Sequence, residues 1–374
     1  MFKSRSIQSS LSIKDKIVSI DYILVFSIFI LGLISILAMY STDGGEFKYH
    51  TNSHILRFFV FFGMFFMVSF ISIRFWHETS YIAYVVIFLL LLGVKYFGLT
   101  SSGSKRWLDL YFMNLQPSEL MKVGLILFLA KYYHRISIES INSFRYLILP
   151  VTVLIAPIIL VATQPDLGTS ILIAAGGIVV AWLAGVRAKF FVFSGLSMIA
   201  LLPIAISFLK PYQKSRILTF LNPERDPLGA GYQIIQSKIA IGSGGLFGKG
   251  FLNGSQSYLD YLPEKHTDFI FTLFSEEFGF FGSVLLLLLY AIIIYRVIKI
   301  GVISRSYFAK LFCYSFGTSL FVYIVINMSM VLGLLPIVGS PLPIMSYGGS
   351  SMLATMIGFG IVMSAKIHSK QSIA

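Results

Sequence analysis

The chain has 374 residues, of which 56% are hydrophobic and only 12% are charged. Soluble domains carry about 25% charged residues, because a folded chain needs a polar coat. The composition therefore excludes a soluble globular protein and predicts an all-α polytopic integral membrane protein. The single cysteine, Cys313, excludes an intrachain disulfide and a cysteine-based metal site. The formal net charge of +13 is spread between apolar segments, which is typical of membrane topology and not of nucleic-acid binding.

Ten apolar segments are candidates for crossing the bilayer, which takes about 20 helical residues. They are residues 20–40, 55–73, 80–99, 119–133, 146–163, 167–185, 190–209, 269–298, 308–332 and 342–366. The first lacks a small-residue cleavage site, so we expect an anchor and not a removable signal peptide. No polar stretch is long enough to fold alone. We therefore expect residues 1–374 to form one membrane domain.

The basic residues predict the orientation of these spans. With the N-terminus inside, the inside segments contain 16 Lys and Arg residues, and the short outside segments contain five. Basic residues are retained on the cytoplasmic side, and an even number of spans returns the chain to the side where it started. We therefore expect both termini in the cytoplasm and the long connection 210–267, between spans seven and eight, outside.

The 58-residue connection 210–267 is too long for a simple turn, and such connections are usually functional or disordered. Residues 231–241 have apolar side chains at helical spacing, which predicts a short amphipathic helix on the membrane surface. A glycine-rich run follows. It is not a nucleotide-binding P-loop, because Ser243 stands where that motif needs its first glycine and Gly250 stands where it needs Ser or Thr. No nucleotide cofactor is expected.

Four ionisable residues gather at the start of the eighth span: Glu264, Lys265, His266 and Asp268. Two interpretations of Asp268 remain open. One is that it caps the outer end of the helix, where a carboxylate satisfies free N–H groups and complements the helix dipole. The other is a general base, which needs a carboxylate partly withdrawn from water.

Glu276 and Glu277 lie two turns further along the same segment. Ionisable residues inside a membrane are functional candidates. The alternative interpretation is that this helix starts late and that both residues lie at the membrane interface.

A second polar cluster surrounds the fourth span. Lys105 and Arg106 at the outer boundary are suited to a phosphate, with Trp107 at headgroup level. The alternative is an ordinary interfacial anchor. Glu119 and Lys122 are three residues apart, so they share one helix face and can pair. Two further polar breaks, at residues 164–166 and 346–351, face the same side. Together they predict a shared outer cavity.

These segments resemble the signature of the SEDS family (shape, elongation, division and sporulation). The resemblance rests on Arg106-Trp107-Leu108, Gln116-Pro117-Ser118-Glu119, Gln164-Pro165-Asp166-Leu167-Gly168-Thr169, Leu262-Pro263-Glu264-Lys265-His266-Thr267-Asp268, Glu276-Glu277-Phe278-Gly279 and Ser346-Tyr347-Gly348-Gly349-Ser350. The run from Gly248 to Ser257 is more similar to the elongation members than to the division members, although Phe251 stands where tryptophan is expected.

The resemblance implies a bacterial peptidoglycan glycosyltransferase of the cytoplasmic membrane that polymerises lipid II during elongation. It implies a class B penicillin-binding transpeptidase and other elongation-complex proteins as partners, and a divalent cation, Mg²⁺ or Mn²⁺, whose ligands it does not identify. Asp268 is the implied catalytic residue and Asp166 a second important one. The candidate substrate-binding residues are Lys105, Arg106, Trp107, Glu119, Lys122, Asp166, Glu264, Lys265, His266, Ser346, Gly348, Gly349 and Ser350.

Two other functions compete with this one. A lipid-precursor flippase would need ionisable residues on both sides of a central cavity, whereas these motifs cluster outward, and no internal repeat supports an inverted-repeat transporter. A non-catalytic scaffold of the cell-wall machinery would tolerate loss of the Asp268 carboxylate.

Overall fold

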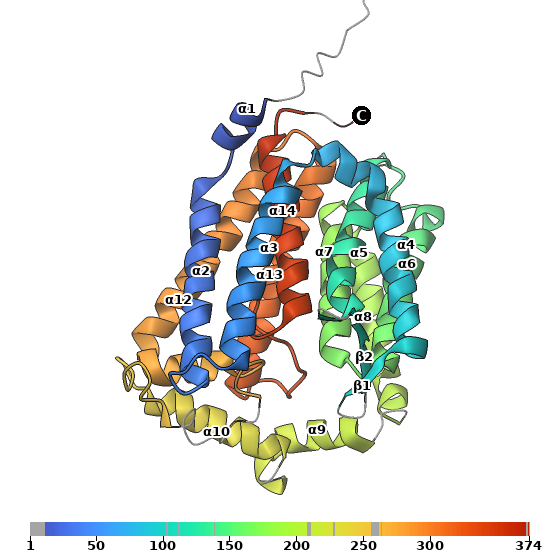
Figure 1. Cartoon of the computed structure of the whole chain (residues 1–374). Helices are drawn as coiled ribbons and strands as arrows, with labels where there is room; N and C mark the ends of the chain where they lie inside the picture. Colours follow the sequence, from blue (N-terminus) through green and yellow to red (C-terminus); the bar gives the residue numbers. More distant parts are fainter. Residues whose placement is uncertain are drawn as a thin grey trace, which may run out of the picture.

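The structure is a computed structural model that describes residues 12–101, 104–110, 113–137, 139–207, 211–226, 229–255, 262, 264–371 and 373. It is mostly helical (Figure 1). The long helices are α2 (Tyr22–Thr42), α3 (Tyr49–Phe70), α4 (Ile73–Phe97), α5 (Pro117–His134), α6 (Phe144–Thr163), α7 (Leu167–Leu183), α8 (Ala188–Ser207), α12 (Ile270–Ile303), α13 (Tyr307–Val331) and α14 (Gly349–Ile367). The short helices are α1 (Ile13–Val18), α9 (Pro211–Leu221), the 3₁₀ helix η1 (Pro223–Arg225) and α10 (Ala230–Ser243).

Within the described residues, seven helices are long and apolar enough to cross a membrane: α2, α3, α4, α6, α12, α13 and α14. The predicted spans four, six and seven correspond to α5, α7 and α8. Of these, α5 carries Glu119, Lys122 and Lys131, while α7 has 17 residues and the apolar part of α8 is Ala188–Leu201. The chain is therefore a multi-pass helical protein, and the number of ten spans stays a prediction.

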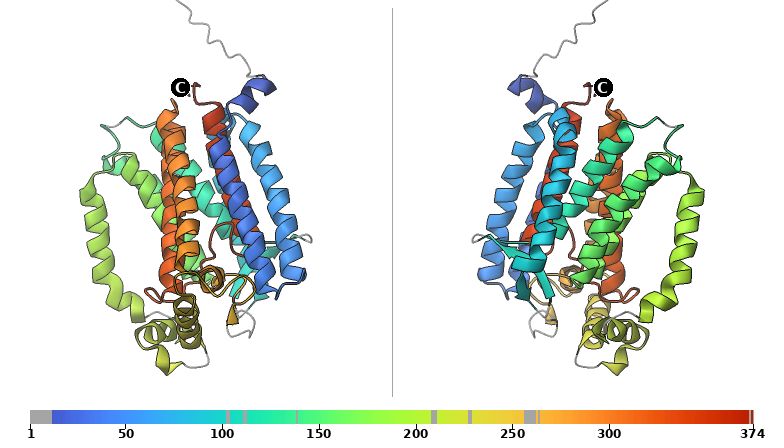
Figure 2. Two further views of the ribbon diagram at one scale, coloured as in Figure 1. Left: turned by 90° about the vertical axis from the view of Figure 1, so that its left-hand side faces the viewer. Right: turned by 90° about the vertical axis from the view of Figure 1, so that its right-hand side faces the viewer.

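The helices run between two ends of the molecule. In Figure 1, α1 and the C-terminus lie at the top, whereas α9, α10 and the strands lie at the bottom. The side views in Figure 2 show the same separation. The first and last described helices, α1 and α14, therefore reach one end of the bundle, opposite the connection between α8 and α12.

The expectation of a purely α-helical fold is wrong at one place. Three short antiparallel strands, β1 (Leu99–Ser101), β2 (Ser104–Asp109) and β3 (Asn114–Leu115), form a small sheet in the order β1-β2-β3. Leu99 pairs with Trp107, and Leu108 pairs with Leu115. This sheet forms the connection from α4 to α5. Strands of two to six residues give too short a pattern to be recognised among long apolar helices.

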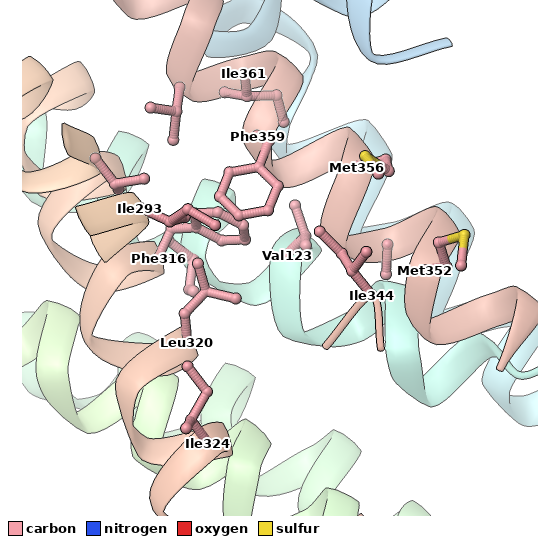
Figure 3. Packing of buried hydrophobic residues seen from close by; sticks show 14 of the residues in the cluster. Val123, Ile293, Phe316, Leu320, Ile324, Ile344, Met352, Met356, Phe359 and Ile361 are labelled. Carbon is pink, nitrogen blue, oxygen red and sulfur yellow. The ribbon is translucent and has the colours of Figure 1, made fainter. Parts of the chain in front are cut away.

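The core lies around α14, which is the most buried of the candidate spans and packs against α3, α5 and α12. Phe359 of α14 contacts Phe316 of α13 edge to face, with ring centroids 5.3 Å apart. Figure 3 shows these rings beside Leu320 and Ile344. Such dense apolar packing fixes the helices that carry the polar groups described below.

Several boundaries differ from the prediction: α3 begins at Tyr49 and α4 at Ile73, six and seven residues before the predicted spans two and three. The tenth span was expected to start at Leu342, but α14 starts at Gly349, because residues 342–348 form a turn in which Ile344 has a φ of 66°. The amphipathic helix predicted at 231–241 is confirmed as a helix, α10.

Candidate functional site

The turn formed by residues 264–269 is held through its backbone. The carbonyl of His266 accepts a hydrogen bond from the Tyr347 N–H at 2.8 Å. The next carbonyl, that of Thr267, accepts one from the Ser346 hydroxyl at 2.6 Å. Both donors belong to the connection between α13 and α14, so two segments far apart in the sequence are joined here.

Asp268 completes this series of carbonyls. Its carbonyl accepts a hydrogen bond from Asn327 Nδ2 at 3.0 Å, and the same amide donates to the Ser340 carbonyl at 2.7 Å. The N-cap of α12 is Phe269. The prediction that Asp268 caps the helix directly is therefore wrong, because the turn extends one residue further than expected.

The side chain of Asp268 lies at the border of an apolar interior. Asp268 itself is partly buried, and Phe269 and Ile270, which follow it, are fully buried. A β-carbon added at Gly339 would lie 3.7 Å from Asp268 Oδ2, so the carboxylate faces the connection between α13 and α14. The Asp268 carboxylate therefore lies where the turn meets the buried start of α12.

His266 connects the same turn to the connection between α2 and α3. Its Nε2 lies 3.0 Å from Asp43 Oδ1, and its ring stacks on that of His50 at 4.1 Å. Burial lowers the pKa of His266, as does the neighbouring His50, despite the opposing Asp43 carboxylate. Burial would raise the pKa of Asp43, but hydrogen bonds from Thr51 and His266 outweigh it and hold this pKa below its usual value.

The α12 helix is kinked at Gly279, which has a φ of 65°. A continuous helix would bond the N–H groups of Phe280 and Phe281 to the carbonyls of Glu276 and Glu277. The kink separates these four groups. Without other partners, each of these backbone groups would lack a hydrogen bond.

The glycine-rich segment 244–254 supplies those partners. The N–H groups of Lys249 and Gly250 donate to the freed carbonyls of residues 276 and 277, each at 3.0 Å. The carbonyls of Gly245 and Leu246 accept from the N–H groups of residues 280 and 281, at 2.9 and 3.1 Å. The loop is therefore inserted into the hydrogen-bond pattern of the helix that follows Asp268.

Side chains reinforce this insertion. Glu276 is fully buried and accepts hydrogen bonds from Lys249 Nζ at 2.6 Å and from the Ser255 hydroxyl at 2.9 Å. Glu277 is also buried and accepts one from the Ser41 hydroxyl. The alternative interpretation, in which the helix starts late, is wrong about the start, because the helix already begins at Ile270.

The basic cluster lies on β2. Lys105 is exposed, and Trp107 is partly buried. The Arg106 guanidinium donates to the Gln164 carbonyl at 3.2 Å and to the Pro165 carbonyl. Arg106 therefore holds the turn before α7, and Lys105 is the residue of this cluster that is open to an anionic ligand.

Asp166 is the N-cap of α7 and is almost fully buried. Its Oδ1 accepts from the Thr169 N–H at 3.1 Å, and its Oδ2 accepts from the Thr169 hydroxyl and from Gln116 Nε2, both at 2.9 Å. The Gln116 N–H in turn donates to the Ser350 hydroxyl at 2.8 Å. The structure thus joins Asp166, the start of α5 and the start of α14.

Glu119 and Lys122 form the predicted pair, at 2.7 Å, inside the helix bundle. The Lys122 ammonium lies 4.0 Å from the centre of the Tyr323 ring, and the Tyr323 hydroxyl lies 3.5 Å from Glu119. These three side chains line a cavity of about 20 Å³. It has room for a water molecule and not for a sugar.

The segment from residue 346 to 350, which leads into α14, contacts both the Asp268 turn and the residues just before α5. Its first residue, Ser346, binds the Asp268 turn, and its last, Ser350, binds Gln116 and the carbonyl of Asn114 at 3.0 Å. Gly348 is the N-cap of α14. A β-carbon on Gly349 would lie 3.6 Å from the side chain of Arg57, which is an ordinary van der Waals contact, so this neighbour does not require a glycine.

Two further candidate residues lie at the start of the same turn. Glu264 is exposed and accepts a hydrogen bond from the Thr267 hydroxyl at 2.9 Å. Lys265 is partly buried. Pro263 of the same motif and residues 256–257 of the elongation-type run lie outside the described residues.

Sequence reasoning missed four residues of this region: Asp43, His50, Asn327 and Tyr323. Asn327 and Tyr323 lie in an apolar span, where a polar side chain indicates a candidate functional residue. Asp43 ends α2 and His50 lies in the first turn of α3, and nothing in their spacing points to residue 266. Their proximity to it comes from the tertiary fold alone.

The sequence and the fold both match known proteins. Residues 18–371 match the family FTSW_RODA_SPOVE, described as cell cycle protein. The peptidoglycan glycosyltransferase MrdB of Escherichia coli K12 is 45% identical over 288 residues, which cover 77% of each chain.

Two solved structures have the same fold. One, described as showing structural coordination of polymerization and crosslinking by a peptidoglycan synthase complex, has a TM-score of 0.81 and 31% identity, covering 94% of this chain and 99% of the other. The other is the Rod shape determining protein RodA of Thermus thermophilus, with a TM-score of 0.71 and 26% identity, covering 94% and 98%.

Proposed function

This chain belongs to the FTSW_RODA_SPOVE family, and we propose that it polymerises lipid II at the outer face of the bacterial cytoplasmic membrane. It is a multi-pass membrane peptidoglycan glycosyltransferase that serves cell elongation and rod shape. The proposal includes ten spans in one membrane domain and cytoplasmic termini. It also includes a class B penicillin-binding transpeptidase as partner, which the crosslinking complex with the same fold supports.

The backbone support of the Asp268 turn is the observation that carries the proposal. Three successive carbonyls, of residues 266, 267 and 268, are each held by a donor from α13 or from the connection that follows it. A catalytic side chain must be held within a fraction of an ångström of its working position. A turn fixed in this way at the mouth of an apolar helix provides that support.

In the proposed reaction, Asp268 acts as general base. It accepts the proton of the 4-hydroxyl on the N-acetylglucosamine of one lipid II. The oxygen then forms a bond to the anomeric carbon of a second lipid-linked sugar, with inversion. The bond from that carbon to the pyrophosphate oxygen breaks, and undecaprenyl pyrophosphate leaves with the electron pair.

Basic side chains at the outer face are suited to the leaving group. Lys105 is exposed on β2 and free to meet a pyrophosphate, whereas Arg106 holds the turn beside it. Lys122 is paired with Glu119, and its ammonium is buried among membrane helices. We therefore assign Lys105 to the pyrophosphate, and Arg106 and Lys122 to positioning.

A divalent cation, Mg²⁺ or Mn²⁺, is part of the proposal. When bound, it would supply positive charge opposite the pyrophosphate. Among the described residues, one group of three potential ligands comes together: Asp43, His50 and His266. Two imidazoles and a carboxylate fit Mn²⁺ better than Mg²⁺, which prefers oxygen ligands.

The test is polymerisation of labelled lipid II by the purified protein, with products separated by gel electrophoresis. The Asp268→Asn protein should fold but be slower by roughly 10²–10⁴-fold, the usual contribution of a general base. Glu46→Gln, which alters an exposed carboxylate on the same side, is the matched control and should polymerise normally.

Normal polymerisation by a well-folded Asp268→Asn protein would show that Asp268 is not a catalytic residue. Two further measurements, one in vesicles and one in cells, distinguish the two other functions. A flippase would move lipid II between leaflets without forming polymer, and a scaffold would support wall synthesis in cells whether or not residue 268 carries a carboxylate.

A further inference from the structure

Three potential metal ligands from separate segments meet at the outer end of the bundle. Asp43 is the C-cap of α2, His50 lies in the first turn of α3, and His266 lies in the turn before α12. One ligand atom from each lies within 4.8 Å of the others. Asp43 Oδ1 is 3.0 Å from His266 Nε2 and 3.5 Å from His50 Nδ1.

The two oxygens of Asp43 have different surroundings. Oδ2 accepts two hydrogen bonds from Thr51, at 2.9 Å from its N–H and 2.6 Å from its hydroxyl. Oδ1 faces the two imidazoles. Metal-binding carboxylates commonly have this arrangement, in which a second-shell donor orients the side chain and leaves one oxygen for the ion.

The spacing also fits a metal ion. Ligand distances of about 2.1 Å in a tetrahedral site place neighbouring donor atoms about 3.4 Å apart. The two contacts of Asp43 Oδ1, at 3.0 and 3.5 Å, lie on either side of this value. The side chain of His50 is 41% exposed, so its ring can rotate to close the widest separation.

We propose that Asp43, His50 and His266 bind one divalent transition-metal ion. The nitrogen ligands favour Mn²⁺ or Zn²⁺ over Mg²⁺. Such an ion links the connection between α2 and α3 to the turn that carries Asp268, two residues after His266. The site thereby stabilises the position of the proposed base. The proposal stands on this ligand geometry and does not require that the chain polymerise lipid II.

The experiment measures metal binding directly. The full-length protein, purified in detergent and stripped of metal with a chelator, is titrated with Co²⁺ and with Zn²⁺. Visible absorption of Co²⁺ and calorimetry with Zn²⁺ are the readouts. We expect one ion per chain, Co²⁺ bands typical of nitrogen and oxygen ligands, and a rise in the unfolding temperature when metal is added.

Substitutions in this cluster test whether these residues bind the metal ion. His50→Ala should weaken binding at least tenfold, and it removes a ring that is 41% exposed and lies outside the apolar core. Thr51→Val, which removes one hydrogen bond to Asp43, should weaken it by roughly 10–100-fold, as second-shell changes do. Lys48→Ala, an exposed change in the same connection, is the control and should bind metal normally.

Two results would overturn the proposal. One is the lack of stoichiometric binding by the folded wild-type protein, which would make the cluster a hydrogen-bonded contact only. The other is unchanged affinity in both His50→Ala and His50→Gln. Metal binding without polymerisation would leave this site intact and count against the proposed function, so the two failures are distinguishable.

Discussion

Arg106 illustrates how a charged side chain can act through the backbone of another segment. Its guanidinium bridges two consecutive carbonyls, and these precede Asp166, the N-cap of α7. A lysine retains the charge but offers a single ammonium in place of the planar fork. The residue therefore acts by geometry as much as by charge.

We expect Arg106→Lys to lose nearly as much polymerisation activity as Arg106→Ala, because neither restores the two hydrogen bonds. Lys105→Ala should instead weaken lipid II binding without lowering the unfolding temperature, since Lys105 is exposed. Rates at several lipid II concentrations and thermal unfolding in detergent are the measurements. Full activity in Arg106→Lys would show that charge alone matters at this position.

Asn327 is a residue that we expect to affect Asp268 indirectly, through the backbone. Asn327→Leu keeps the approximate volume but leaves the carbonyls of Asp268 and Ser340 without this donor. An unsatisfied buried group costs about 1–3 kcal/mol. We expect a lower unfolding temperature and a lower kcat, with a smaller effect on KM.

Thr318→Val is the matched control on the same helix. The Thr318 hydroxyl donates a hydrogen bond to the Tyr314 carbonyl at 2.8 Å, and both residues belong to α13. The variant removes this hydroxyl. This variant should keep its polymerisation rate. If both variants lose the same stability and Asn327→Leu keeps its kcat, Asn327 supports the fold and not the position of Asp268.

At the scale of elements, the insertion of the 244–254 segment into the kink of α12 depends on close backbone approach. Gly248 has a φ of +81°, and a β-carbon there would lie 2.0 Å from the Glu277 carbonyl oxygen. Only glycine fits without moving one of the two segments. The kink and the loop are thus one structural unit, although each is marked in the sequence by glycines alone.

Gly248→Ala should therefore destabilise the protein by more than about 3 kcal/mol, through both backbone strain and the clash. Gly242→Ala is the control, because a β-carbon there meets nothing within 4 Å and alanine is favoured within a helix such as α10 by about 1 kcal/mol. Folded yield and unfolding temperature after purification compare the two. Equal stability of the two variants would contradict the inserted loop.

At the scale of the whole molecule, the sequence predicted the helices well and the contacts between them poorly. Apolar length marks the helices locally, so each predicted span lies on a helix. The small sheet was missed because its strands are short. The contacts of Asp43 with His266, and of Gln116 with Ser350, join residues 223 and 234 positions apart. No periodicity encodes such pairs, which arise only when the helices pack.

The orientation of the molecule in the membrane is the remaining prediction at this scale. Figure 1 places α1 and the C-terminus at one end, and the basic residues predict that this end is cytoplasmic. The connection between α2 and α3, which contains Glu46, must then lie outside. Because the single native cysteine, Cys313, is fully buried, introduced cysteines can be labelled against a low background.

Intact spheroplasts treated with a membrane-impermeant maleimide should label Glu46→Cys and not Lys14→Cys, and both should be labelled after permeabilisation. Residues 14 and 46 are exposed, so access to the reagent depends on the side of the membrane and not on burial. The opposite labelling pattern would reverse the predicted orientation of the molecule in the membrane. It would place Asp268 and the Asp43 cluster in the cytoplasm, away from the face where glycan strands are assembled.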